Sequence, residues 1–310
     1  SKLESIPFFP PSIKKIDELA FSGCKIESVS FASSSILEEI CGNVFSSWSI
    51  KHILSIPASV KRIEKCAFRS LGNLKTVTFA STDESCLIEI DDKCFDYCRD
   101  LNSVVGIPSS IKRIGHSAFE NCVNLKEIKF QSTKLNGSST VEIEEIGNNA
   151  FAYCKKLEGV MFIPESIKRI GRNSFAYCSK LKTLEFPIKS KLRNISSDSF
   201  FHSSISELII PKAIEYFEEG WCRDTNELNN IKIFDDNNAE MKMINNDILI
   251  KLMNTQDYDY ISSTITETNQ IEMMNEIFSV LFHAYHMKKD KLSLILLRNN
   301  PNAEYKYSYD

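Results

Sequence analysis

Residues 107–130 read IPSSIKRIGHSAFENCVNLKEIKF, and two other stretches repeat this order almost residue for residue. Residues 56–79 read IPASVKRIEKCAFRSLGNLKTVTF, and residues 163–186 read IPESIKRIGRNSFAYCSKLKTLEF. Self-similarity at a fixed period is the sequence signature of a repeat architecture, in which each copy is one small structural unit. The repeated stretch therefore decides the fold.

Four apolar columns recur through nine consecutive copies of this unit. The anchor of each copy is a phenylalanine, whose position in the ninth copy is filled by Cys222, beside Trp221. The anchors are Phe21, Phe45, Phe68, Phe95, Phe119, Phe151, Phe175 and Phe200. Five residues earlier come Ile16, Ile40, Ile63, Ile90, Ile114, Ile146, Ile170, Ile195 and Phe217. Five or six residues later come Ile26, Ile50, Leu74, Leu101, Leu125, Leu157, Leu181, Ile205 and Leu228. Three residues beyond those come Val29, Ile53, Val77, Val104, Ile128, Val160, Leu184, Leu208 and Ile231.

The copies alternate between two kinds. Odd copies open with a proline, whereas even copies lack it and follow a polar insert such as residues 80–85 or 131–140. The prolines are Pro10, Pro57, Pro108, Pro164 and Pro211. The full period is therefore a pair of copies, and it measures 47, 51 and 56 residues between successive odd anchors from Phe21 to Phe175.

Each copy contains one clear strand signal. In residues 125–130, Ile128 and Phe130 alternate with polar residues, which is the period of a half-buried strand. A shorter extended piece is expected at Ile111–Ile114, and the segment 117–122 between them is too short for more than one helical or 3₁₀ turn. A unit of this size cannot bury its apolar face alone, so stacked copies must share one continuous core.

The order IPxSVxxIGxxAFxxCxxLxxVxF resembles the leucine-rich repeats of the BspA-like surface antigens, also called the Treponema pallidum type, over about residues 3–233. The resemblance implies a solenoid and a family frequent in trichomonad parasites and some mouth and gut bacteria. It further implies a position at the cell surface and a role in adhesion, with no catalytic residues. Leu3, Ile6 and Phe8 fit the end of a preceding copy, so repeats are expected to begin before residue 1.

We assign the chain to the α/β class, with two parts. Residues 1–233 are expected to form a leucine-rich-repeat solenoid with short parallel strands stacked in a curved sheet. Residues 234–310 lose the repeat and are expected to form an α-helical cap or separate module. The first helix is predicted from about Asp235 to Asn254, the second from Glu267 to Lys289 and the third from Lys291 to Arg298.

Cysteines recur at one position, three residues after the anchor. They are Cys24, Cys98, Cys122, Cys154 and Cys178, while Trp48, Leu71, Ser203 and Thr225 fill the same column in other copies. Neighbouring copies stack about 4.8 Å apart if they pair as strands, so Cys98 with Cys122, or Cys154 with Cys178, could form disulfides. The recurrence of one slot favours the simpler interpretation, in which each cysteine is a small buried filler.

Charges alternate down the stack at the two residues before each first-column isoleucine. Odd copies carry basic pairs such as Lys112-Arg113 and Lys168-Arg169, and even copies carry acidic residues such as Glu38-Glu39 and Glu144-Glu145. Opposite charges on adjacent strands attract by roughly 0.2–1 kcal/mol per pair. We therefore interpret this charge ladder as a device that fixes the register of the stack. It also argues against a nucleic-acid interface, because each basic step has an acidic neighbour.

The strand positions between the core columns are expected to face outward and to form the partner-binding face. They are His52, Thr76, Thr78, Ser103, Glu127, Lys129, Thr183, Glu185 and Glu207. The second outward column is apolar in the even copies, at Leu54, Val105, Met161 and Ile209. Two interpretations remain: an apolar ligand stripe, or a bulge that turns these side chains inward because even strands carry one extra residue. The bulge is favoured.

The remaining composition excludes several function classes. The 310 residues are 43% hydrophobic and 25% charged with a net charge of −4, which gives no basic field for nucleic acid. No nucleophile, metal or phosphate-binding motif is present, so no enzyme activity, cofactor or metal is expected. Gly115, Gly147 and Gly171 are interpreted as turn glycines. Asn136 and Asn194 are glycosylation acceptors if the chain is secreted.

These observations favour a non-enzymatic interaction scaffold, with a surface adhesin or antigen suggested by the resemblance alone. The expected partner is a protein, for example of a host cell or matrix, and no transmembrane segment is expected in this chain. An intracellular adaptor built on the same repeats is the alternative, because the cysteines show no evident pairing design.

Overall fold

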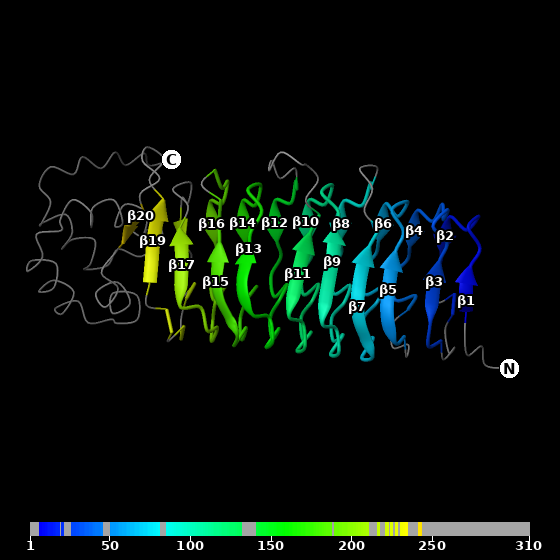
Figure 1. Ribbon diagram of the computed structural model, residues 1–310, viewed down its shortest axis with the longest axis horizontal. Helices are drawn as coiled ribbons and strands as arrows, with labels where there is room; N and C mark the ends of the chain where they lie inside the picture. Colours follow the sequence, from blue (N-terminus) through cyan, green and yellow to red (C-terminus); the bar gives the residue numbers. More distant parts are fainter. Residues whose placement is uncertain are drawn as a thin grey trace, which may run out of the picture.

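The computed structural model describes residues 6–18, 20–21, 26–45, 50–80, 85–131, 141–187, 189–210, 216–217, 221–222, 224–225, 227–228, 230–234 and 241–243. Over these residues the chain forms a solenoid of β-strands joined by turns, with two strands in each copy (Figure 1). The stacked parallel strands confirm the predicted leucine-rich-repeat solenoid. Within the described ranges no helix is long and apolar enough to span a membrane.

The first row of strands carries the LxxVxF segments and is called here the long-strand face. Its members are β1 (Ile6–Phe9), β3 (Val29–Phe31), β5 (His52–Ile56), β7 (Leu74–Phe79), β9 (Ser103–Ile107), β11 (Glu127–Phe130), β13 (Gly159–Phe162), β15 (Leu181–Glu185), β17 (Glu207–Ile210) and β19 (Asn230–Phe234). These strands pair in parallel as three separate sheets, β1-β3, β5 to β11 and β13 to β19. The row is therefore interrupted twice.

The second row consists of two-residue strands that end on the first-column isoleucines. Its members are β2 (Lys15–Ile16), β4 (Glu39–Ile40), β6 (Arg62–Ile63), β8 (Glu89–Ile90), β10 (Arg113–Ile114), β12 (Glu145–Ile146), β14 (Arg169–Ile170), β16 (Asn194–Ile195) and β18 (Tyr216–Phe217). All nine strands form one continuous sheet. This row holds the copies together across both interruptions of the long-strand face.

The anchor phenylalanines form a stack of parallel rings through the core. Successive rings from Phe45 to Phe119 lie 5.2–5.3 Å apart between centroids, with planes within 8° of parallel. The stack continues through Phe151, Phe175 and Phe200, and it ends where Phe200 meets the edge of Trp221 at 5.9 Å. Offset ring pairs contribute roughly 0.5–1.5 kcal/mol beyond the area they bury. The predicted anchor column is thus the spine of the core.

The α/β class is wrong for the described residues, because the turn after each short strand contains no helix. In each turn that the structure describes in full, the residue two positions before the anchor and the residue two positions after it adopt left-handed φ values of 51–62°, for example Ser117 and Asn121. Such residues interrupt a right-handed helix. The anchor amide donates forward to the next copy, as from Phe119 N to Ala150 O at 2.8 Å, instead of back along its own turn. Stacking thus replaces the helical hydrogen bonds.

The first predicted C-terminal helix is wrong where it can be checked. Residues 241–243, which lie inside it, form strand β20 (Met241–Met243), antiparallel to β19. The main-chain groups of β19 would otherwise be unpaired at the end of the row, and β20 covers them. The rest of the predicted helical segment, residues 235–240 and 244–310 with the second and third helices, lies outside the described residues.

The recurring glycines serve close packing and not the turn conformation expected from the sequence. Gly115, Gly147 and Gly171 have no positive φ, whereas Gly106 and Gly159 do. A Cβ on Gly147 would lie 2.7 Å from the carbonyl carbon of Gly115, and one on Gly171 would lie 2.6 Å from that of Gly147. Real Cβ atoms do not approach backbone so closely, so these glycines let consecutive copies touch.

The structure confirms the pairing of opposite charges in the charge ladder. Lys15 and Arg62 flank Glu39 at 3.3 and 3.7 Å. Arg113 contacts Glu89 at 3.1 Å, and also reaches Asp91 and Asp92. Arg169 contacts Glu145 at 2.6 Å. The charged atoms belong to residues that are direct partners in the short-strand sheet, such as Arg113 and Glu89, so the pairs are set by the strand register.

Gly147→Ala should destabilise the solenoid by about 1–3 kcal/mol, because the new methyl group overpacks against the backbone of Gly115. Gly72→Ala is the matched control, since its Cβ would have no atom within 4 Å, and it should change stability by less than about 0.5 kcal/mol. Urea unfolding of the two variants measures the difference. Equal stabilities would contradict the close-packing role.

Replacing Lys112 and Arg113 together by glutamate should destabilise the solenoid by about 1–3 kcal/mol at low salt, because several ion pairs are lost and like charges then face each other. Reversing the acidic neighbours Glu89, Glu144 and Glu145 as well should recover much of the loss. Thermal unfolding at low and high salt measures both effects. An unchanged melting temperature of the first variant at low salt would refute the charge ladder.

Candidate functional site

The long-strand face is open between β11 and β13. β11 is the last strand of one sheet and β13 is the first strand of the next, so neither pairs with the other. The two segments meet only near their starts, where the Glu158 amide donates to the Lys126 carbonyl oxygen at 3.4 Å. Behind the opening, β10 and β12 remain paired. The gap therefore lies on one face of an otherwise continuous stack.

An extra residue in β13 explains the opening. In β15, Leu184 follows Leu181 by three positions, whereas in β13 its register partner Met161 follows Leu157 by four. The additional residue is accommodated at Gly159, whose φ is +75°. It precedes the core position, so β13 begins out of step with β11. In β9 the extra residue lies after the core position, at Gly106 with φ +76°, and β9 stays paired with both neighbours.

The bulge also changes which side chains face the core. Met161, with 6% of its surface exposed, occupies the core position, while Val160 is 46% exposed. This corrects the prediction that Val160 belongs to the core column. A one-residue shift moves every side chain of a strand to the opposite face. β5 has the same kind of bulge, and Leu54 is buried in register with Val77. The favoured interpretation of these apolar residues is thus confirmed for Leu54 and Met161.

The other two apolar residues of that column differ. Val105 lies before the bulge in β9 and is half-buried on the outward side. Ile209 is buried next to Leu208, which itself occupies the core position in register with Leu184. A continuous apolar ligand stripe is therefore absent from the described part of the long-strand face.

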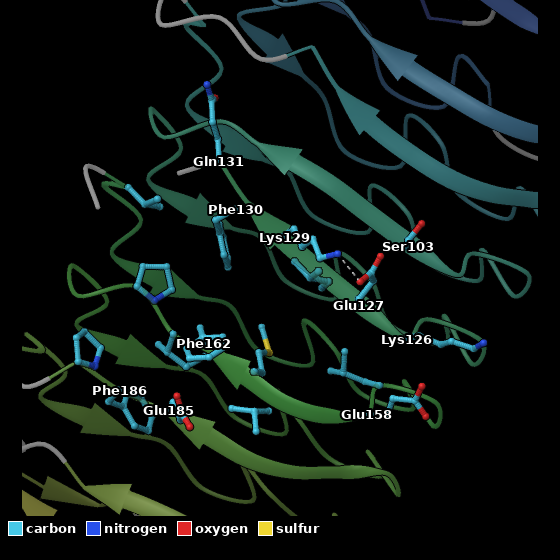
Figure 2. Close-up of a pocket in the computed structure, with 18 of the residues that line it drawn as sticks. Ser103, Lys126, Glu127, Lys129, Phe130, Gln131, Glu158, Phe162, Glu185 and Phe186 are labelled. Carbon is cyan, nitrogen blue, oxygen red and sulfur yellow. Dashed lines mark ion pairs between the residues drawn. The ribbon is translucent and has the colours of Figure 1, made fainter. Parts of the chain in front are cut away.

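The opening forms a groove of about 1060 Å³, called here the interstrand groove, bounded by Glu127–Phe130 of β11 and Val160–Phe162 of β13. Figure 2 shows Phe130 and Phe162 on its two walls. Phe162 is the most exposed large apolar side chain of the described residues, at 69%. Ile128 and Phe130 are only half-buried, although their register partners in β9, Val104 and Ile107, are fully buried. Exposed apolar groups gathered in one place typically mark a binding surface.

The charges around the groove are unbalanced. Glu127 and Lys129 neutralise each other through an ion pair of 2.8 Å, drawn in Figure 2. Glu158, Glu165 and Glu185 line the groove from the β13 side without an ion pair among the described residues, and Lys126 lies opposite them. Among the residues that the structure describes, three carboxylates without an ion pair thus face one ammonium group without one. The groove combines apolar walls with a net negative charge.

The structure brings four of the predicted site residues together at this groove: Ser103, Glu127, Lys129 and Glu185. Thr76, Thr78, Thr183 and Glu207 lie in other strands of the long-strand face. Thr76 and Ser103 share a hydrogen bond of 3.3 Å between their hydroxyls. His52 opens β5, but its side chain lies outside the described residues.

Sequence reasoning missed Phe130, Val160 and Phe162 as surface residues, because it assigned Phe130 and Val160 to the core pattern. The available signal was the spacing between Leu157 and Pro164, which is one residue longer than that between Leu181 and Pro187. That count shows an extra residue in the copy. It does not show on which side of the core position the bulge falls, and this decides whether the sheet opens.

The cysteine column consists of free thiols that act as hydrogen-bond donors. Each Sγ donates to the carbonyl oxygen of the anchor in the preceding copy, as from Cys98 to Phe68 at 3.2 Å and from Cys122 to Phe95 at 3.1 Å. Cys154 and Cys178 do the same, and Thr225 replaces the thiol with a hydroxyl 2.9 Å from the Phe200 oxygen. The column therefore satisfies buried carbonyls, a role beyond the expected filling of space, while Cys24 lies outside the described residues.

One cluster has the composition of a metal site. Ligand atoms of Glu39, Cys41 and Glu64 lie within 4.8 Å of one another. Each already has a protein partner: Glu39 pairs with Lys15, Glu64 accepts the Gly42 amide at 2.9 Å, and the Cys41 thiol donates to Asp17 Oδ1 at 3.9 Å. Burial raises the pKa of the Cys41 thiol. A protonated thiol is a poor ligand. These partners explain the cluster without a metal.

The comparison with protein families matches most of the chain. Residues 1–126, 88–229 and 144–277 match the model described as the BspA type leucine rich repeat region, in six copies. No curated protein matches the sequence.

Solved structures resemble parts of the chain at low identity. A T. pallidum leucine rich repeat protein is 23% identical with a TM-score of 0.45, covering 58% of this chain and 72% of that one. A leucine rich cell surface protein of Faecalibacterium prausnitzii is 18% identical with a TM-score of 0.45, and the match covers 76% of this chain but only 53% of that protein. The pneumococcal vaccine antigen PcpA is 18% identical with a TM-score of 0.33, with 76% and 73% covered.

Alkaline pH should destabilise the solenoid through the thiol column. Burial raises the pKa of Cys98 to about 12 and that of Cys122 well above its usual value. In the unfolded chain these thiols lose their protons above about pH 8.5. The contribution of the buried thiols to the free energy of unfolding is therefore fully present below that pH. It falls as the pH rises, by up to about 1.4 kcal/mol per thiol and pH unit. Unfolding measured from pH 8 to 10.5 should show this slope.

Cys122→Ser should reduce the slope of unfolding free energy against pH by the contribution of one thiol. Cys86→Ser removes an exposed thiol and should leave the slope unchanged. The comparison isolates the buried thiols from lysines and tyrosines that titrate in the same range. The same slope in Cys122→Ser and the parent chain would contradict the assigned cause.

Proposed function

The chain belongs to the BspA type leucine rich repeat family, and on this premise we propose that it is a non-enzymatic scaffold that binds a protein partner through its long-strand face. The observation that carries the proposal is the interstrand groove with exposed Phe162 and Val160 beside it. Aromatic residues dominate the energetics of protein interfaces. Leucine-rich repeats serve as interaction scaffolds, so family and surface point the same way.

The proposed binding face consists of the predicted outward residues together with the three that the structure adds. Thr76, Thr78, Ser103 and Thr183 supply hydroxyls that can donate or accept, and Glu127, Lys129, Glu185 and Glu207 supply charge. Phe130, Val160 and Phe162 supply apolar contact. Interfaces typically have an apolar centre surrounded by polar groups, and the described face has this distribution around the groove.

A cell-surface antigen or adhesin is the form of this function that the family resemblance favours. The partner would then be a host-cell or matrix protein. An intracellular adaptor is the second candidate, and one observation favours it: the nine cysteines within the described residues are all free thiols. Free thiols persist most readily in a reducing compartment. Seven of the nine are buried, and burial also protects thiols in an oxidising compartment. The experiment at the end of this section distinguishes the two candidates.

A glycan at Asn194 does not help to separate the candidates. Asn194 is buried, with 6% of its surface exposed, and lies within the short-strand sheet. The folded solenoid has no room for a sugar at that position, whatever the compartment. Asn136 lies outside the described residues and is the acceptor to examine.

A photo-crosslinking amino acid at Thr76 or Thr183 should form adducts with a partner protein in cells that express the chain, because both lie on the long-strand face. The control places the same amino acid at Lys61, directly before β6 of the short-strand row. Adducts are detected by a size shift on a denaturing gel. Equal labelling from both rows, or none from the long-strand face, would refute the proposed binding face.

The same cells separate the two candidates. Antibody labelling of the chain without permeabilisation, lost after mild protease treatment, is expected for the surface antigen. Labelling only after permeabilisation would exclude it and leave the adaptor.

A further inference from the structure

We propose that the interstrand groove binds an extended segment of the partner as an additional β-strand between β11 and β13, and that this segment alternates apolar with basic residues. The inference rests on the proposed function and deepens it, because it names the kind of segment that the long-strand face recognises. Two strand edges, an uncovered part of the core and a set of free carboxylates each point to the same occupant.

The main chain supplies the first argument. Among the described strands, β11 pairs only with β9 and β13 only with β15, so each presents an unpaired edge to the groove. Unpaired strand edges are templates for a further strand, and peptides bind many domains by adding to such an edge. An inserted strand would have an edge to pair with on each side, beyond the Glu158–Lys126 hydrogen bond that joins the two segments near their starts. Because β11 and β13 each have four residues, the occupant needs only about four or five, at roughly 3.3 Å per residue.

The uncovered core supplies the second argument. Ile128 occupies a core position in register with the buried Val104. It is only half-buried because no described strand pairs with the second edge of β11 and covers it. Phe130 is half-buried for the same reason, and both pack against the edge of the main core. Alternate residues of an inserted strand would face these two side chains. Apolar residues at those positions would complete the core at this step of the stack.

The free charges supply the third argument and define the other alternate residues. Phe162 is the register partner of Glu185, so the exposed ring and the carboxylate lie side by side on the outward face. A lysine of the inserted strand can lay its aliphatic stem over Phe162 and place its ammonium group near Glu185. Glu158 and Glu165 add two carboxylates without an ion pair among the described residues. An acidic segment would instead meet like charges.

The probe is a fluorescein-labelled peptide, Lys-Val-Lys-Phe-Lys-Val-Lys, titrated into the full chain and followed by fluorescence anisotropy. One control peptide replaces every lysine by glutamate. A second carries methyl groups on two adjacent central amide nitrogens, which removes one main-chain donor toward each wall. We expect binding of the basic peptide to be at least tenfold tighter than that of either control.

Variants of the chain locate the binding. Phe162→Ser should weaken binding of the basic peptide about tenfold, and Glu185→Gln about three- to tenfold at low salt. Both positions are exposed or half-exposed, so the fold is not at risk. Deletion of Gly159 restores the residue spacing of β15, should let β13 pair with β11, and should abolish peptide binding without lowering the melting temperature.

Hydrogen exchange gives an independent readout. Bound peptide should slow the exchange of amides in Glu127–Phe130 and Gly159–Phe162, and leave those of β7 unchanged. Equal affinity for the methylated peptide, equal affinity for the acidic peptide, or unchanged exchange at the groove would each overturn the proposal. Concentration-dependent dimers of the chain alone that disappear in Phe162→Ser would also overturn it, since a second copy would then be the occupant.

The outcomes for the two proposals are distinguishable. Partner adducts at Thr76 or Thr183 without peptide binding at the groove would retain the scaffold and reject the inserted strand. Peptide binding and exchange protection without any partner adduct would retain the strand site and reject the proposed cellular role.

Discussion

Every copy must place its core residues at the same spacing, because the copies share hydrogen bonds on both rows and ring contacts through the middle. The Phe stack, the close glycine contacts and the short-strand sheet all hold neighbouring copies at nearly one strand spacing. A copy with one residue too many cannot spread the excess over several units. The backbone must accommodate the extra residue in a bulge at one position. In β9 and β13 the bulge falls at a glycine with positive φ, Gly106 and Gly159. The position of the bulge relative to the core residue then decides whether neighbouring long strands stay paired.

The core of the solenoid could be predicted from the sequence because it depends on repetition. An apolar column kept over nine copies needs no knowledge of distant contacts, since each copy meets only its neighbours. The charge ladder was accessible for the same reason: Arg113 and Glu89 occupy equal positions in adjacent copies. The turns were not accessible, since left-handed residues as varied as Cys66, Lys93 and Ser117 share only their position, two residues before the anchor, and have no common side chain. The α/β assignment failed at this point.

The outward-facing residues of the long strands could be predicted only in part. Alternation along a strand correctly placed Thr76 and Glu185 on the outward face, because a regular strand fixes which side chains point out. It failed at Val160 and Met161, where a bulge exchanges the two faces. The position of a bulge depends on a balance between the backbone freedom of Gly159 and the pairing lost with β11. Because that balance also depends on the two neighbouring strands, the sequence of one copy does not determine where the bulge falls.

The unequal continuity of the two rows has a mechanical consequence. A stack of copies under load behaves like a beam whose stiffness comes from its two edges, and here one edge is an unbroken nine-stranded sheet while the other is divided into three blocks. Bending that stretches the divided edge meets no strand ladder at β3/β5 or β11/β13, where the main-chain bonds are those from Lys51 N to Glu27 O and from Glu158 N to Lys126 O. Bending in the opposite sense compresses packed side chains. The molecule is thus compliant in one direction, and its flexure is concentrated at two joints between rigid blocks.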